Sequence, residues 1–135
     1  LQKSYHALKV PYTLCVRLRM PHGHGGAGEN PEEIRTFADS FFRDGVPLVT
    51  VSKPKRTGNI AEVKGMDCLP FTAELNYTTD TGVWQKREWK SLPAEVNVAA
   101  GTVKAELPAD TAVYYFNIKQ SDKLVVSSEH EEIRK

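Results

Sequence analysis

Residues 102–119, Thr-Val-Lys-Ala-Glu-Leu-Pro-Ala-Asp-Thr-Ala-Val-Tyr-Tyr-Phe-Asn-Ile-Lys, are the stretch that decides the fold class. Two short alternating runs, Thr102–Leu107 and Val113–Lys119, lie on either side of the turn signal Pro108-Ala-Asp. Short runs of this kind, rich in Val, Ile, Tyr and Phe and bounded by Pro or Asp, are typical of β-strands. The stretch therefore predicts two consecutive strands.

The same pattern extends outward through most of the chain. Five further runs of this kind precede or follow the pair: Leu48–Val51, Ile60–Val63, Thr72–Thr78, Arg87–Leu92 and Lys123–Ser128. The turn signals between them are Arg56-Thr-Gly-Asn, Asp80-Thr-Gly, Ala100-Gly and Ser121-Asp. About seven short strands with a turn every ten or so residues indicate an antiparallel β-sandwich. We predict that the sandwich spans residues 46–135.

One segment gives the sandwich a more specific type. Asp110-Thr-Ala-Val-Tyr-Tyr-Phe resembles the tyrosine-corner segment of immunoglobulin-type domains, Asp-x-Ala-x-Tyr-x-Cys. The resemblance implies that Tyr114 is the corner tyrosine, whose hydroxyl bonds to nearby backbone. It places Phe116 where such domains carry a disulfide cysteine, so apolar packing would replace that disulfide. Trp84 or Trp89 would supply the core indole. The expected class is a mainly β, immunoglobulin- or fibronectin-III-like sandwich.

Residues 1–45 show a different pattern and are expected to form a separate strand–loop–helix segment. In residues 12–20, Leu14, Val16, Leu18 and Met20 alternate with Cys15, Arg17 and Arg19, which predicts a strand that ends at Pro21. His22-Gly-His-Gly-Gly-Ala-Gly follows, and so many glycines predict a loop with unusual backbone freedom.

A helix is predicted after this loop. Asn30 suits the N-cap, Pro31 the first helical position, and Glu33 lies three residues after the cap. Gly45 is placed to end the helix. The apolar residues that recur at helical spacing, and would form its buried stripe, are Ile34, Phe37, Ala38 and Phe41.

The N-terminal segment and the sandwich together resemble the C-terminal part of a group of bacterial α/β-hydrolases, the acetyl xylan esterase-like and prolyl-oligopeptidase-like proteins. The resemblance lies in Arg17-Leu-Arg-Met-Pro-His-Gly-His-Gly and Asn30-Pro-Glu-Glu-Ile-Arg-Thr-Phe-Ala-Asp-Ser. It extends to the sandwich tail through Ala73-Glu-Leu-Asn-Tyr-Thr-Thr-Asp-Thr-Gly-Val-Trp-Gln-Lys-Arg-Glu-Trp. It covers nearly the whole chain but only the last third or so of the family's length.

This resemblance implies that the histidine loop carries the catalytic base of a serine hydrolase. In that family the histidine stands between glycines, which favours His24 over His22. No Gly-x-Ser-x-Gly occurs in the sequence, and the strands that would carry the nucleophile, the oxyanion donors and the acid are absent. A base without a nucleophile is not an active site, so the chain alone is expected to be inactive.

Two other interpretations of the histidine loop stay open. His-x-His in a glycine-rich loop is also compatible with a surface feature of no consequence. A metal site would need a third ligand, for which Glu29 and His6 are the nearest residues, but the spacing is not that of structural zinc. We therefore predict neither a metal nor a cofactor. Cys15 and Cys68 are expected to be unpaired buried thiols, with a disulfide between them as the alternative.

Composition narrows the range of partners. The chain has 18 Lys+Arg and 17 Asp+Glu, a formal net charge of +1, and no long basic run, which disfavours nucleic acid and anionic membranes as partners. Tyr77, Trp84 and Trp89 are candidates for stacking on a carbohydrate, although core packing accounts for most aromatic residues in a sandwich. The charged end, residues 129–135, is expected to be a solvated tail.

These observations predict the C-terminal fragment of a secreted or periplasmic carbohydrate esterase or peptidase, with residues 46–135 as an accessory sandwich. The alternative is a non-enzymatic immunoglobulin-like binding module. One strand and one helix cannot cover each other fully. We therefore expect residues 1–45 to dock on the sandwich, on the rest of a hydrolase core or on a second copy, with Phe37 and Phe41 in the contact.

Overall fold

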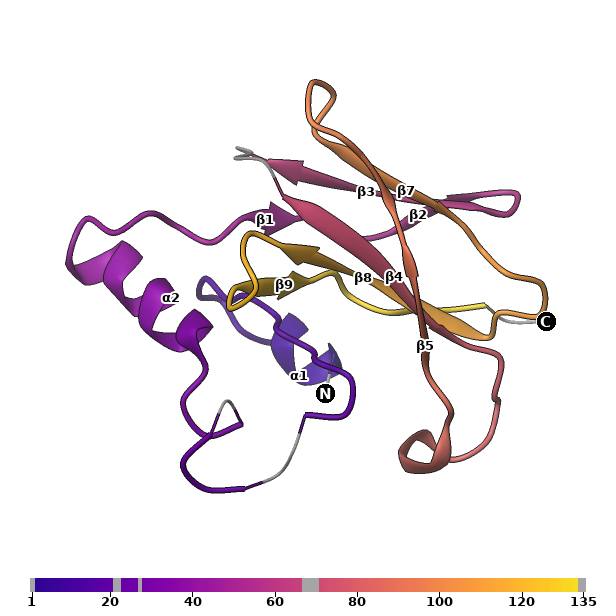
Figure 1. The fold of residues 1–135 in the computed structure, drawn as a ribbon, viewed down its shortest axis with the longest axis horizontal. Helices are drawn as coiled ribbons and strands as arrows, with labels where there is room; N and C mark the ends of the chain where they lie inside the picture. The colour runs from indigo at the N-terminus through magenta and orange to yellow at the C-terminus, as the bar shows by residue number, and fades with distance from the viewer. Residues whose placement is uncertain (1, 21–22, 27, 67–70, 134–135) are drawn as a thin grey trace.

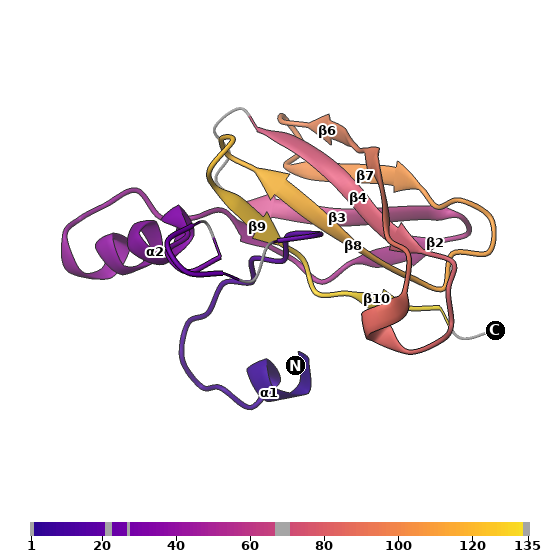
Figure 2. The same cartoon turned by 60° about the horizontal axis from the view of Figure 1, so that its bottom comes forward.

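Two antiparallel β-sheets form a sandwich, with the N-terminal part of the chain beside it (Figures 1 and 2). The computed structural model describes residues 2–20, 23–26, 28–66 and 71–133. The first sheet contains β1 (Thr50–Val51), β2 (Lys55–Thr57), β3 (Ile60–Met66), β6 (Glu95–Asn97) and β7 (Thr102–Glu106). The second contains β4 (Thr72–Thr78), β5 (Lys90–Pro93), β8 (Val113–Lys119), β9 (Val125–Ser127) and β10 (Glu131–Glu132). The helical elements are α1 (Gln2–His6), α2 (Glu32–Phe42) and the 3₁₀-helix η1 (Trp84–Lys86). The predicted mainly β sandwich is confirmed.

The order of the strands is that of an immunoglobulin-type sandwich. In the first sheet the order is β1-β3-β7-β6, and β2 pairs with β3 on the same side as β1. In the second sheet β8 lies between β4 and the pair β9 and β10, and β5 lies at the other edge. Taking β1 and β2 as strand A and β9 and β10 as strand G, the two sheets are A-B-E-D and C′-C-F-G. Within the described residues, no helix is long and apolar enough to cross a membrane.

The core between the sheets comes from alternate residues of the central strands. Tyr114, Phe116 and Ile118 of β8 are fully buried, and so are Val63 of β3 and Leu75 of β4. Successive side chains of a strand point to opposite faces, so Tyr115 and Asn117 of β8 face outward. They are buried as well. The second sheet is therefore covered on its outer face too.

Tyr114 is buried at the expected corner position, but its hydroxyl does not make the expected hydrogen bond to backbone. The hydroxyl of Tyr114 donates to Oε2 of Glu131 at 2.7 Å, a side chain of β10, and not to backbone. Phe116 is buried in the core where a disulfide would stand, as predicted. The expected core indole is wrong, because Trp84 is exposed and Trp89 packs its ring against Tyr115 on the outer face of the sheet. Leu75 fills the core on strand C instead.

Strands β2, β6 and β10 were not predicted. Residues 56–59 were assigned to a turn, but Arg56 and Thr57 belong to β2, which pairs with β3 through a tight turn at Gly58, whose φ of 63° favours glycine. The end of the chain was expected to be a solvated tail, yet Glu131 and Glu132 pair with Tyr114 and Val113. These strands lie at sheet edges, where polar sequences are common because one side faces water.

The predicted strand over residues 12–20 does not form. The described part of this segment is extended and makes a single bridge to the sandwich, between Leu14 and Ser127 of β9. Two residues further on, the amide of Val16 donates to the side-chain hydroxyl of Ser127 at 2.8 Å and not to a backbone carbonyl. The backbone pairing with β9 therefore does not continue past Leu14. Beyond it the chain turns at Arg19, whose φ is 56°. Cys15 is unpaired, as predicted, but it is exposed and not buried. Cys68 lies outside the described residues.

The helix α2 forms as predicted, but its ends and its buried face differ. Pro31 occupies the N-cap with extended backbone, and Asn30 provides no side-chain cap. At the other end Asp44 takes the left-handed conformation with φ of 52°, while the amide of Gly45 donates to the carbonyl of Asp39 at 3.1 Å. The left-handed residue that follows α2 is therefore Asp44, one residue earlier than the expected Gly45.

The apolar stripe of α2 is not buried as a whole. Phe37 packs against the core cluster, whereas Phe41 is 55% exposed and Ile34 is exposed as well. The buried face is instead centred on Glu33 and Phe37, and it lies toward β9 (Figure 2). The described part of residues 1–45 therefore docks on the sandwich, with Phe37 in the contact and without Phe41.

Candidate histidine loop and its surroundings

The candidate catalytic residue His24 stands on a loop that leaves its imidazole in solvent. Its side chain is fully exposed, at 101% of the reference area. Gly25 next to it has φ of 81°, a conformation that favours glycine. The amides of Glu29 and Asn30 both donate to the carbonyl of Gly26, at 3.0 and 3.1 Å, and thereby fold the loop back on itself. His22, the second choice, lies outside the described residues.

This fold-back brings Glu29 next to His24. Oε1 of Glu29 is 3.4 Å from Nδ1 of His24, and its Oε2 accepts the backbone amide of Gly25. Among the described residues, Glu29 is the one hydrogen-bond partner of this imidazole. The sequence had suggested Glu29 only as a metal ligand. The sequence feature that could have suggested this contact is the run of glycines between His24 and Glu29, which lets the chain fold back tightly.

The other residue considered for a metal, His6, lies elsewhere. Its Nε2 is 2.7 Å from Oε1 of Glu129, close to the sandwich. In the part of the chain that the structure describes, no group of three or more His, Cys, Asp or Glu side chains is arranged to hold a metal ion.

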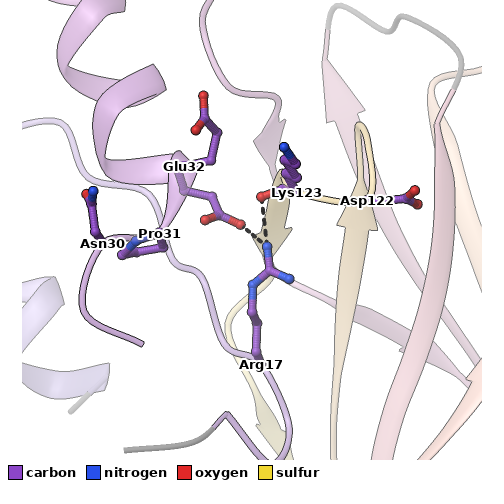
Figure 3. A pocket seen from close by; sticks show the side chains of 7 residues that line it. Arg17, Asn30, Pro31, Glu32, Asp122 and Lys123 are labelled. Carbon is purple, nitrogen blue, oxygen red and sulfur yellow. Dashed lines mark hydrogen bonds and ion pairs between the residues drawn. The ribbon is translucent and has the colours of Figure 1, made fainter. Parts of the chain in front are cut away.

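Behind the loop, Arg17 and Glu33 tie the segment to the sandwich. The guanidinium of Arg17 donates to Oε1 of Glu33 and, at 2.8 Å, to the carbonyl of Lys123 (Figure 3). Glu33 is only 4% exposed, and its Oε1 also accepts the amide of Val125 at 2.9 Å. Burial works to raise the pKa of the Glu33 carboxyl, but the bonds from Val125 and Arg17 outweigh it, so the pKa lies below its ordinary value.

These residues line a shallow pocket at the start of α2. Its walls are formed by Arg17, Asn30, Pro31, Glu32, Glu33, Asp122 and Lys123 (Figure 3). Arg17 and Glu33 bind each other there, while Nε of Arg17 and Oε2 of Glu33 are buried without a hydrogen-bond partner among the described residues. Nothing in the sequence indicates this tie, because the local pattern assigns Arg17 to a strand and Glu33 to a capping position of the helix.

A second anchor holds the same segment closer to its start. Asn117 of β8 donates from Nδ2 to the carbonyl of Val16 at 3.1 Å, and the hydroxyl of Ser127 donates to Oδ1 of Asn117 at 2.7 Å. The amide of Ser127 donates to the carbonyl of Leu14 at 2.8 Å. The polar side chains on the outer face of the sheet are thus used to hold the N-terminal segment.

The aromatic residues suggested for carbohydrate stacking are only partly brought together. The rings of Trp84 and Trp89 are 5.8 Å apart, and Arg87 lies over the Trp84 ring with its Cζ 4.4 Å from the centroid. The rings of His130 and Trp84 form a T-shaped contact, with their centroids 5.1 Å apart. Tyr77 is not part of this group, because it packs against the core. One face of Trp84 is therefore occupied by a guanidinium.

Comparisons with known proteins returned no match of any of the three kinds: no protein-family model, no curated protein and no solved structure.

Proposed function

We propose that this chain is the C-terminal part of a secreted or periplasmic serine hydrolase, of the carbohydrate-esterase or peptidase type, in which His24 is the general base. The observation that carries the proposal is the His24 imidazole, which projects fully into solvent from a glycine-rich loop and has a carboxylate, Glu29, beside Nδ1. A general base needs a ring nitrogen that a substrate or nucleophile can reach. The sequence resemblance described above supports the same assignment.

In this proposal the nucleophile and the oxyanion donors come from residues outside the chain, and the sandwich is an accessory domain. The isolated chain should therefore hydrolyse p-nitrophenyl acetate no faster than free imidazole does. Saturable turnover by the isolated chain that His24→Ala abolishes would mean that a nucleophile is present here, and the assignment of a fragment would be wrong.

The positive test uses the polypeptide that the reading frame encodes upstream of and through this chain. We expect it to contain a Gly-x-Ser-x-Gly sequence and to hydrolyse acetyl or peptidyl esters. The His24→Ala variant of that polypeptide should lose most of its kcat. A reading frame without an upstream serine motif, or full activity of the His24→Ala variant, would refute the proposal.

The exposed apolar side chains of the N-terminal part support a partner for this region. Ile34 and Phe41 lie seven residues apart on α2 and Phe42 is 85% exposed, so an apolar surface faces away from the sandwich. The proposed partner is the rest of the hydrolase core, and self-association is the second candidate. Sedimentation of the isolated chain separates them, since a dimer that Phe42→Asp dissociates would favour self-association.

The second candidate function is a non-enzymatic, immunoglobulin-like binding module. The specific observation in its favour is the pair of neighbouring indoles, Trp84 and Trp89, at the surface of the second sheet. Aromatic pairs of this kind stack on carbohydrate rings, so an oligosaccharide is the proposed ligand. Titration of xylo-oligosaccharides against the indole fluorescence tests it, with Trp84→Ala as the variant that should lose any response.

A further inference from the structure

The histidine loop holds more of a catalytic apparatus than the resemblance implies. On that resemblance, the acid that orients the histidine should come from a strand outside this chain. Yet the loop itself places a carboxylate at the ring, with Oε1 of Glu29 3.4 Å from Nδ1 of His24.

The position of Glu29 is set by several independent hydrogen bonds. Its Oε2 accepts the amide of Gly25, the residue directly after His24. Its own amide donates to the carbonyl of Gly26 at 3.0 Å, and the neighbouring amide of Asn30 donates to the same carbonyl. Gly25 supplies the positive φ that this return requires, at 81°. Glu29 is therefore held by hydrogen bonds at both its backbone and its side chain.

The contact has a direct consequence for the proton on the imidazole. An ionised carboxylate only accepts hydrogen bonds, so Nδ1 must carry the proton when it bonds to Glu29. The lone pair of the neutral ring then lies on Nε2, which points away from Glu29. This tautomer is the one in which a histidine can take a proton from a nucleophile through Nε2.

We propose that Glu29 is the positioning residue of His24, holding it in the Nδ1–H tautomer with Nε2 free for the nucleophile. The inference rests on the proposed role of His24 as a general base. It means that base and orienting carboxylate come from one loop, and that only the nucleophile and the oxyanion donors remain to be supplied from outside the chain.

The test is the tautomer of His24 in the isolated 135-residue chain, read from the ¹⁵N shifts of its two ring nitrogens. The measurement is made near pH 8, where an ordinary histidine is neutral. His24→Gln identifies the resonances. Glu29→Ala should lower the ratio of the Nδ1–H to the Nε2–H form by roughly two- to fivefold, which corresponds to the weak contribution of a solvent-exposed contact with a carboxylate.

The matched control is Glu32→Ala, which removes a nearby carboxylate that pairs with Arg35 and not with the loop. It should leave the His24 ratio unchanged. If Glu29→Ala also leaves the ratio unchanged, or if Glu32→Ala lowers it equally, Glu29 does not orient the ring and the inference is overturned.

This outcome is independent of the proposed function. Loss of the tautomer preference in Glu29→Ala supports the contact whether or not a hydrolase is found. In the complete enzyme, Glu29→Ala should lower kcat and leave KM unchanged, because the residue acts through His24 and not on the substrate. If His24→Ala abolishes activity while Glu29→Ala changes neither kcat nor the tautomer, the proposed function stands and this inference fails.

Discussion

Val125 donates its backbone amide to Oε1 of Glu33 at 2.9 Å, and this one bond joins the first turn of α2 to strand β9. Arg17 donates to the same oxygen, so a buried carboxylate connects three separate parts of the chain. A buried acceptor with two donors is costly to remove, because the amide of Val125 is then left without this partner and the guanidinium of Arg17 keeps only the carbonyl of Lys123. Glu33 is thus one of two anchors of the N-terminal segment, beside the bonds from Asn117 and Ser127.

Glu33→Ala should lower the free energy of unfolding by about 1–3 kcal/mol, the cost of leaving buried donors unpaired. Urea unfolding followed by circular dichroism measures it. Glu32→Ala is the control, since Glu32 is only partly buried and pairs with the exposed Arg35, so its loss should change stability little. Equal effects of the two substitutions would show that Glu33 does not hold the segment.

The same carboxylate predicts a dependence of stability on pH. The pKa of Glu33 is lower in the folded protein than in the unfolded chain, where a glutamate titrates near 4.3. Its contribution is therefore complete above that value and is lost as the pH falls through the folded pKa. Wild type should lose more stability than Glu33→Gln between neutral pH and about pH 3. A constant difference between the two proteins across this range would contradict the assignment.

Two adjacent tyrosines offer a matched pair of substitutions. Tyr114→Phe removes the hydroxyl that donates to Glu131 at 2.7 Å and should cost about 1–3 kcal/mol, as for a hydrogen bond to a charged group. Tyr115→Phe removes a buried hydroxyl for which the described residues provide no partner. That change should be neutral or stabilising, because an unpaired buried polar group is lost. Thermal unfolding compares the two, and an equal loss from both would refute this account.

The sandwich should fold when residues 1–45 are deleted. The described residues that form the apolar core all lie from Leu48 onward, and among the described N-terminal residues Phe37 is the one apolar side chain that packs against this core. Stability should nevertheless fall, since Asn117 and Ser127 lose their hydrogen bonds to Val16. Circular dichroism and amide dispersion of residues 46–135 test this. An unfolded chain would place the domain boundary elsewhere.

The strands that could be predicted from the sequence are those with an alternating pattern of their own and turn residues at their ends. β4 and β8 were predicted to the residue, because both alternate and both end at turn residues. β2 and β10 are polar, and they become strands only because β3 and β8 offer unpaired backbone groups beside them. The residues of β2 and β10 alone do not indicate that a neighbouring strand will pair with them.

The helix and the candidate site show the same division. Helical spacing predicted α2 but not which of its residues is buried. Glu33 is buried, and Phe41 is not, because Arg17 and Val125 both donate to the Glu33 carboxylate. Neither donor belongs to the helix, so the local pattern does not show them. For the site, the glycines predicted a loop of unusual backbone freedom around His24. The contact with Glu29 depends on how that loop closes, and hydrogen bonds within a loop leave no periodic pattern to detect.

The long sequence separation of these ties sets an order of events during synthesis. Val125 follows Glu33 by 92 residues, and Ser127 follows Val16 by 111. A ribosome adds roughly 5–20 residues per second, so the helix and the histidine loop leave it roughly 5–20 s before their attachment points exist. During that interval Phe37 has no core to enter. The N-terminal segment, although made first, cannot take its place on the sandwich until β9 has been made, and until then the nascent chain carries the apolar side of α2 exposed.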